Sequence, residues 1–116
     1  MTAVFSEHIS EQLIHIVEFG YGETLASKVE AVFKANRIGV YLISNFFTAR
    51  GEKVEIIFDY SQPYVYNVEN TSIVFSTSQI MPFLIECLTE NHIGFGPGNI
   101  LASTDEETGL PMLIIR

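Results

Sequence analysis

Four side chains near the start of the sequence have types and spacing that could bind a metal ion: His8, Glu11, His15 and Glu18. Their offsets of three, four and three place them on one stripe of a helix, and imidazole and carboxylate groups are common zinc ligands. The sequence does not identify the remaining ligands, so a solvated helix face with local His–Glu contacts explains the stripe better. We expect no metal site.

Cys87 and His92 form a second pair that could do chemistry, as a nucleophile and its base. Cys87, however, falls on the apolar face of an expected helix, where a thiol behaves as a small hydrophobe with a raised pKa. We expect Cys87 to be a core residue and the chain not to be an enzyme.

The glycine-rich segment Gly94-Phe95-Gly96-Pro97-Gly98 could hold a phosphate through its backbone N–H groups. It lacks the Lys-Ser/Thr pair of a P-loop, and no clear helix follows it. We expect it to be a connecting loop, and we expect no cofactor.

The distribution of charge is the most informative feature of the sequence. The net charge is −8, from 14 acidic and 6 basic residues. Residues 1–53 hold six acids and five bases (6 − 5, a balance of −1), whereas residues 54–116 hold eight acids and only Arg116 as a base (8 − 1, a balance of −7). Such a charge argues against nucleic acid or an anionic membrane as a direct partner and favours a cationic one.

Two stretches of this acidic half are candidates for binding that partner. One is the acidic run 105–107 at an expected turn, and the other is the tyrosine-rich stretch 59–69, in which two tyrosines would share one side of a strand. Tyrosine is enriched at the centres of protein interfaces, although aromatic packing between strands explains these tyrosines about as well. The expected partner-binding residues are Asp59, Tyr64, Tyr66, Glu69, Asp105, Glu106 and Glu107.

Hydrophobic periodicity predicts the elements that position these residues. Expected helices span 6–18 with Ser6 as N-cap, 23–36, and 79–91 with Ser78 as N-cap and Pro82 in its first turn. Expected strands span 38–48, 54–60, 64–68, 71–76, 100–103 and 110–115, the last beginning as an edge strand at Pro111.

These elements predict an α+β fold in which an antiparallel sheet is packed against about three helices, because no alternating βαβ pattern is present. Residues 1–116 are expected to form a single domain. The lone cysteine rules out an internal disulfide, and no secretory signal or membrane span is visible. The expected location is the cytoplasm.

In its size, its acidity, its lack of enzyme motifs and its acidic stretches 59–69 and 104–108, the chain resembles bacterial toxin-immunity proteins of the contact-dependent growth inhibition type. This resemblance implies tight one-to-one binding of a cognate nuclease toxin, whose active site the immunity protein occludes. It carries no residue roles, because these families share no diagnostic motif.

Three alternatives remain open at this point. The chain could be a phage-encoded inhibitor that mimics the charge of nucleic acid, or a small ligand-binding module with a deep apolar pocket. It could also be an enzyme whose Asp, Glu and His residues are scattered along the sequence and meet in a cleft.

Overall fold

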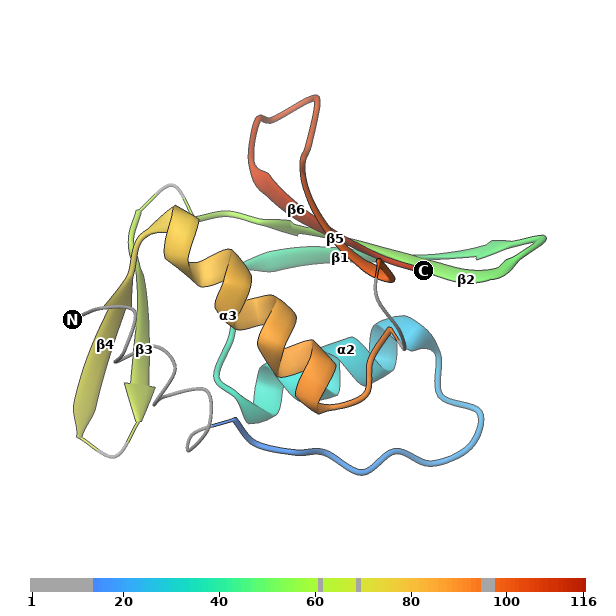
Figure 1. Ribbon diagram of the computed structural model, residues 1–116, viewed down its shortest axis with the longest axis horizontal. Coiled ribbons are helices and arrows are strands. Elements are labelled where there is room, and N and C mark those ends of the chain that lie inside the picture. The colour runs from blue at the N-terminus through green and yellow to red at the C-terminus, as the bar shows by residue number, and fades with distance from the viewer. Residues whose placement is uncertain (1–13, 61, 69, 95–97) are drawn as a thin grey trace.

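The computed structural model describes residues 14–60, 62–68, 70–94 and 98–116 (Figure 1). These residues form a four-stranded antiparallel sheet in the order β1-β2-β6-β5, a separate two-stranded sheet β3-β4, and two helices. This arrangement confirms the predicted α+β class and the antiparallel sheet. In chain order the elements are α2 (Leu25–Ala35), β1 (Tyr41–Thr48), β2 (Gly51–Phe58), β3 (Tyr64–Val68), β4 (Thr71–Phe75), α3 (Thr77–Glu90), β5 (Ile100–Thr104) and β6 (Pro111–Ile115).

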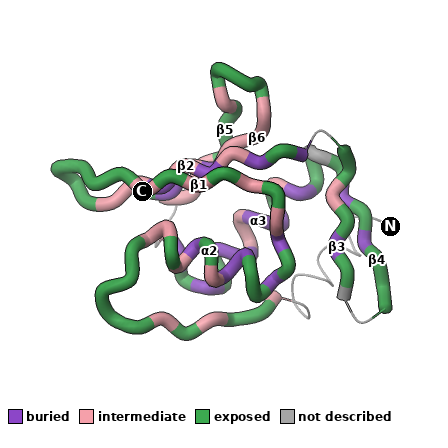
Figure 2. Tube along the Cα trace, turned by 180° about the vertical axis from the view of Figure 1, so that it is seen from behind, coloured by how far each residue is buried: buried purple, intermediate pink, exposed green. Residues whose placement is uncertain are grey.

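The larger sheet has a buried inner face, which α2 and α3 cover (Figure 1). Val54, Ile56 and Phe58 of β2 point to this face and are fully buried. Tyr60, just beyond the strand, is also buried, so alternate residues from 54 to 60 face the core. Figure 2 shows buried residues where the helices meet the sheets, while the tips of the β1–β2 and β5–β6 hairpins are exposed.

Helix α2 begins at an N-cap, Thr24, whose side chain accepts a hydrogen bond of 3.1 Å from the Ser27 N–H. Its buried residues Val29, Val32 and Phe33 recur at the spacing of one helix face. Phe33 packs edge-on against Tyr41, with 5.1 Å between ring centroids, and so joins the helix to the first strand.

Helix α3 starts two residues earlier than expected. Its N-cap is Ser76 rather than Ser78, and Ser76 and Gln79 form a reciprocal capping box. The earlier start places Pro82 inside the helix instead of in its first turn. Cys87 lies on the buried face of the helix, as expected, together with Ile80, Leu84 and Leu88.

The segment that precedes α2 differs from the expectation. The predicted helix 6–18 lies largely outside the described residues, and residues 14–18 are not helical. Two buried asparagines bind this segment: the Asn36 amide oxygen accepts from the His15 N–H at 2.8 Å, and the Asn91 amide oxygen accepts from the Val17 N–H at 2.8 Å. Both asparagines are helix C-caps, so one segment is bonded to the ends of both helices.

The position of the last strand also differs from the expectation. Pro111 begins β6 as predicted, but β6 lies between β2 and β5 and is therefore an inner strand rather than an edge strand. Pro111 pairs with Thr104 at the end of the β5–β6 ladder, where a missing N–H is tolerated best.

Candidate protein-binding surface

The outer face of the larger sheet points away from α2 and α3, and the strand register divides it into rows of side chains. Cross-strand partners lie on the same face of a sheet. Lys53 is opposite Phe46, and Glu55 is opposite Ser44 and Ile114, while Ile57 is opposite Leu42 and Met112. The strand register therefore shows where along the strands each charged side chain of the outer face lies.

Acidic side chains gather at one end of this sheet, where β2 ends and β6 begins. Asp59 follows β2, and its N–H donates to the Val40 carbonyl at 3.0 Å, which extends the β1–β2 ladder by one row. Asp105, Glu106 and Glu107 form the turn of the β5–β6 hairpin, which projects on the side opposite the helices (Figure 1). We call these four residues the acidic end.

The members of the acidic end play different structural parts. The Asp105 carboxylate accepts hydrogen bonds from the Thr108 N–H at 3.0 Å and from its hydroxyl at 2.6 Å. It thereby closes the turn, as Asp commonly does in turns of this kind. Glu106, Glu107 and Asp59 are exposed, and within the described part of the chain they form no ion pair with Lys or Arg.

The side chains expected to supply aromatic contact area at this surface do not do so. Tyr64 and Tyr66 share one side of β3 as predicted, but that side faces the core. Tyr66 is 1% exposed and packs edge-on against Phe83, with centroids 5.2 Å apart. Tyr64 is half-buried, packs on Tyr60 at 4.9 Å, and donates its hydroxyl to the Arg37 carbonyl.

Burial also changes how these tyrosines ionise. Removal from water raises the pKa of Tyr66 from 10.0 to about 12, and it raises the pKa of Tyr60 and Tyr64 as well. The aromatic contact of Tyr66 is with Phe83 of α3, whereas its partner across the strands is Ile73.

The rest of the expected patch at 59–69 is not a purely acidic surface. The Arg37 guanidinium donates to the Asn67 carbonyl at 2.7 Å and so brings a cation to β3. Glu69 lies outside the described residues. Of the seven expected partner-binding residues, the structure places Asp59, Asp105, Glu106 and Glu107 at one end of the sheet.

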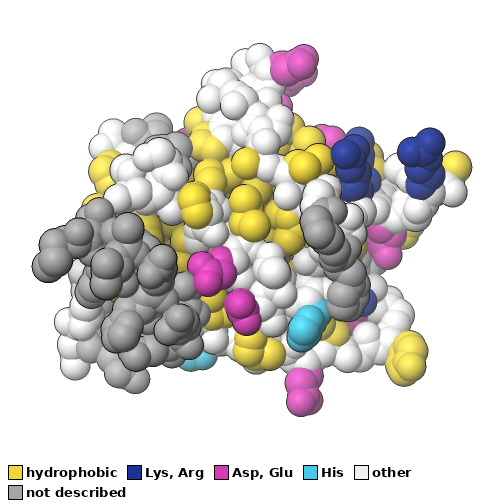
Figure 3. Space-filling model, viewed as in Figure 1, with side chains coloured by type: hydrophobic (Ala, Val, Ile, Leu, Met, Phe, Trp, Pro, Cys, Tyr) yellow, Lys and Arg dark blue, Asp and Glu magenta, His cyan; other side chains and the backbone are white. Residues whose placement is uncertain are grey.

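Basic side chains gather at the opposite end of the sheet, a feature that the sequence did not reveal. Arg50 lies in the β1–β2 turn, Lys53 in the first part of β2, and Arg116 directly after β6. We call these three residues the basic end. In Figure 3 dark blue side chains gather at the upper right, whereas magenta side chains cap the projecting hairpin and occur at scattered places elsewhere. The one signal in the sequence that could have indicated it is Arg50 at the expected turn, three residues before Lys53.

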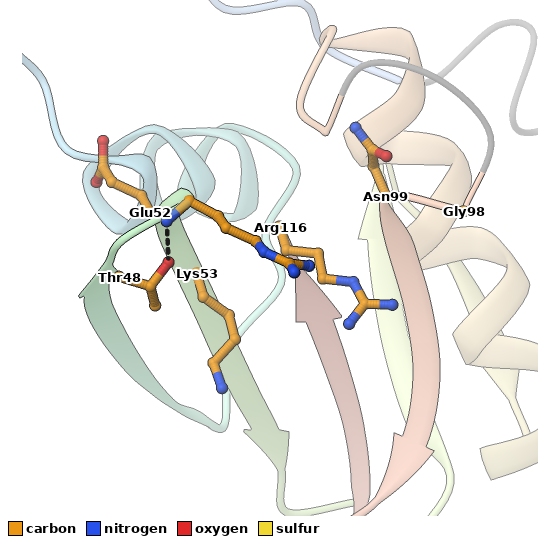
Figure 4. A pocket seen from close by; sticks show the side chains of 7 residues that line it. Thr48, Glu52, Lys53, Gly98, Asn99 and Arg116 are labelled. Atoms are coloured by element: carbon orange, nitrogen blue, oxygen red, sulfur yellow. Dashed lines mark hydrogen bonds between the residues drawn. The ribbon is translucent and has the colours of Figure 1, made fainter.

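The basic end lines an open pocket of about 610 Å³ (Figure 4). Thr48, Glu52, Gly98 and Asn99 complete its lining, so the last residue of the glycine-rich segment borders a cationic space. Lys53 and Arg116 extend into the same space from adjacent strands, while the Glu52 carboxylate points towards α2 and accepts from the Leu25 N–H at 2.9 Å.

Only one cation of the basic end has a charged partner among the described residues. The Lys53 ammonium lies 3.4 Å from the Glu55 carboxylate and 5.3 Å from the centre of the Phe46 ring. Arg50 and Arg116 are exposed and form no such ion pair within the ranges that the structure describes. Their positive charge is available to an anionic group.

Between the two ends, the outer face is apolar. Leu42 is 66% exposed and Phe46 is 42% exposed, and half-buried neighbours from β2, β5 and β6 continue the surface across the sheet. The full set, which we call the apolar patch, is Leu42, Phe46, Ile57, Leu101, Met112 and Ile114. Neither described helix covers it (Figure 1).

The residues first considered for catalysis or metal binding lie away from this surface. Cys87 is fully buried in α3, and burial, with a smaller effect of Glu86, raises the pKa of its thiol to about 12. Among the described residues no group of three or more His, Cys, Asp or Glu side chains is close enough to hold a metal ion, and His8 and Glu11 lie outside them. No described helix is long and apolar enough to cross a membrane.

Comparison of the chain with protein-family models, with curated proteins and with solved structures gives no match. The surface of the molecule is therefore the basis for assigning a function.

Proposed function

We propose that the chain is an acidic inhibitor that binds a basic protein through its acidic end, as an immunity protein blocks a cognate nuclease toxin. One observation carries the proposal: a projecting hairpin presents Glu106 and Glu107 in the open, with no described Lys or Arg paired to them. The six cations of the chain all lie outside residues 54–115, so none neutralises this hairpin from within its own strands.

The proposed mechanism is occlusion of a phosphate-binding surface. A nuclease must hold phosphate groups, and it does so largely with Lys and Arg side chains. Glu106, Glu107 and Asp59 occupy the place of those phosphates, and the negative field of the hairpin accelerates the encounter. The chain performs no chemistry of its own and needs no cofactor, and it acts in the cytoplasm, where the toxin acts.

The experiment measures inhibition of a basic nuclease encoded by the neighbouring reading frame. The variant Glu106→Gln/Glu107→Gln removes two charges but leaves Asp105, which closes the turn. We expect the unmodified chain to inhibit one nuclease molecule per chain, and the variant to associate more slowly and with a weaker dependence on salt.

Three outcomes contradict this assignment. Equal inhibition and equal salt dependence of the two proteins would remove the acidic end from the mechanism. Failure to bind that nuclease, together with binding to a nucleic-acid-processing enzyme that is not a toxin, would favour the phage-type inhibitor instead. Wild-type binding to neither, in a correctly folded sample, would contradict both.

A further inference from the structure

The outer face of the larger sheet carries its charges and its apolar residues in an ordered sequence along the strands. At one end lie Arg50, Lys53 and Arg116; the Lys53–Glu55 pair and the apolar patch follow; Asp59 and the 105–107 turn close the other end. The basic end holds three cations, of which Lys53 is paired with Glu55 and Arg50 and Arg116 form no ion pair among the described residues, and the acidic end holds four carboxylates. The face is thus complementary to itself when it is turned end for end.

A twofold axis that lies parallel to the sheet and perpendicular to its strands relates two copies in this way. It places the outer faces of two copies against each other with their strands antiparallel, so that each basic end meets the acidic end of the other copy. A twofold axis along the strands would instead place like charges together, which is unfavourable. The charge pattern therefore selects one arrangement, and it closes after two copies.

We propose that the outer face binds a second copy of this chain in the antiparallel arrangement and forms a symmetric dimer. The apolar patch forms the centre of the interface, where Leu42 and Phe46 are the most exposed members. The 105–107 turn projects on the side of the outer face (Figure 1), so it reaches the pocket that Arg50, Lys53 and Arg116 of the other copy line.

The size of the face indicates a weak dimer. Four strands spaced about 4.8 Å apart, with a mean of about six residues at 3.3 Å each, cover roughly 400 Å² of flat area per copy. Side-chain relief and the turn increase the accessible area, but the interface remains near the small end of those that are specific, about 1,000 Å² in total. We expect a dimer that dissociates on dilution and at high salt, because its two ends are electrostatic.

This inference does not depend on the proposed function, because it needs only the charges of the chain itself. If both hold, a second copy and a basic partner compete for the same turn, and partner binding requires the dimer to dissociate. The dimer is tested on the purified chain alone, so its failure leaves the proposed function untouched.

Sedimentation velocity over a series of concentrations and at two salt concentrations tests the dimer. The monomer mass is 13.0 kDa, and we expect the weight-average mass to rise with concentration and to level off at twice this value. Leu42→Glu places a charge in the apolar patch and should keep the chain monomeric. Val74→Glu is the matched control, because Val74 is similarly exposed (61%, against 66% for Leu42) but lies on β4, outside the outer face.

Charge reversal tests the antiparallel arrangement. Arg116→Glu places an acid opposite the 105–107 turn of the other copy, because the twofold axis keeps β6 over β6, and should weaken the dimer several-fold, as should Glu106→Arg. The double variant restores opposite charges across the interface and should recover dimer formation. Circular dichroism of each variant verifies that it is folded.

Four results would overturn the proposal. These are a chain that stays monomeric at every concentration, a Val74→Glu variant as defective as Leu42→Glu, a mass that grows without levelling off, and a double reversal that recovers nothing. Unlimited growth would indicate head-to-tail pairing of the sheet edges, β1 of one copy with β5 of the next, instead of the outer face.

Discussion

The two buried asparagines show how much of this fold depends on single polar side chains. Asn36 donates to the Val32 and His15 carbonyls, and Asn91 donates to the Cys87 and His15 carbonyls, at distances between 2.8 and 3.1 Å. Each therefore closes a helix and also binds the same non-helical segment. Neither was singled out from the sequence, because an asparagine near a helix end is common and its distant partner leaves no local signal.

We expect Asn91→Ala to lower the free energy of unfolding by about 2 kcal/mol, because three backbone groups lose a buried hydrogen-bond partner. Urea denaturation measures the change. Asn67→Ala is the control: Asn67 is exposed on β3 and its side-chain amide oxygen accepts from the exposed Ser72 hydroxyl, while its backbone carbonyl, which accepts from Arg37, is kept in the variant, so the change should cost less than about 0.5 kcal/mol. Equal costs for the two variants would contradict the role assigned to Asn91.

Buried ionisable groups at the residue scale predict a loss of stability in alkaline solution. Burial raises the pKa of Cys87 from 9.0 to about 12 and that of Tyr66 from 10.0 to about 12. Above pH 9 the unfolded chain releases these protons more readily than the folded chain does, so rising pH favours unfolding. The contribution of these two groups to the free energy of unfolding should be constant below about pH 9 and should decrease between about pH 9 and pH 12.

Urea unfolding midpoints across this pH range test the expectation, and Cys87→Ala separates the contributions. The variant should lose the part of the decline that begins near pH 9 and keep the part that begins near pH 10, which belongs to the tyrosines. If the urea midpoint of the wild-type chain does not decrease from about pH 9 to about pH 12, the thiol and the tyrosine hydroxyls are not shielded from water.

At the scale of elements, α3 contains a proline, Pro82, at an interior position where proline is unfavourable. Pro82 is the sixth residue of the helix and is exposed. Proline there removes the N–H that would bond the carbonyl four residues earlier, that of Ser78. We expect Pro82→Ala to raise the free energy of unfolding by about 1–3 kcal/mol.

Thermal and urea unfolding measure this change, with Glu90→Ala at the exposed C-terminal end of the same helix as a control that should alter stability little. A loss of stability in Pro82→Ala would show that the geometry imposed by the proline is needed where Phe83 packs against Phe75, with centroids 5.0 Å apart.

Periodicity predicted the strands well because alternation is a local property. The buried residues Val54, Ile56 and Phe58 follow it, and the strand limits differ from the predicted ones by three residues or fewer. The partition of the strands into two sheets was not predictable, since it depends on which strands pair, and pairing is non-local. For the same reason β6 was expected at an edge, and Tyr66 was expected at the surface although its side of β3 faces the core.

At the scale of the whole molecule, the larger sheet carries opposite charges at its two ends. The linear sequence indicated an acidic second half, but it could not place Arg50 and Lys53 beside Arg116, because more than 60 residues separate them along the chain. The antiparallel pairing of β2 with β6 brings them together, and it leaves the 105–107 turn at the far end.

The measurement that tests the central claim most directly is the affinity of the chain for a short fluorescent polylysine peptide at low salt. Two variants lose the same two charges from different places: Glu106→Gln/Glu107→Gln from the acidic end, and Glu86→Gln/Glu90→Gln from α3. If the acidic end is the docking surface, the first variant binds the peptide several-fold more weakly than the second. Equal losses in the two variants would show that only net charge matters and would contradict a localised binding surface.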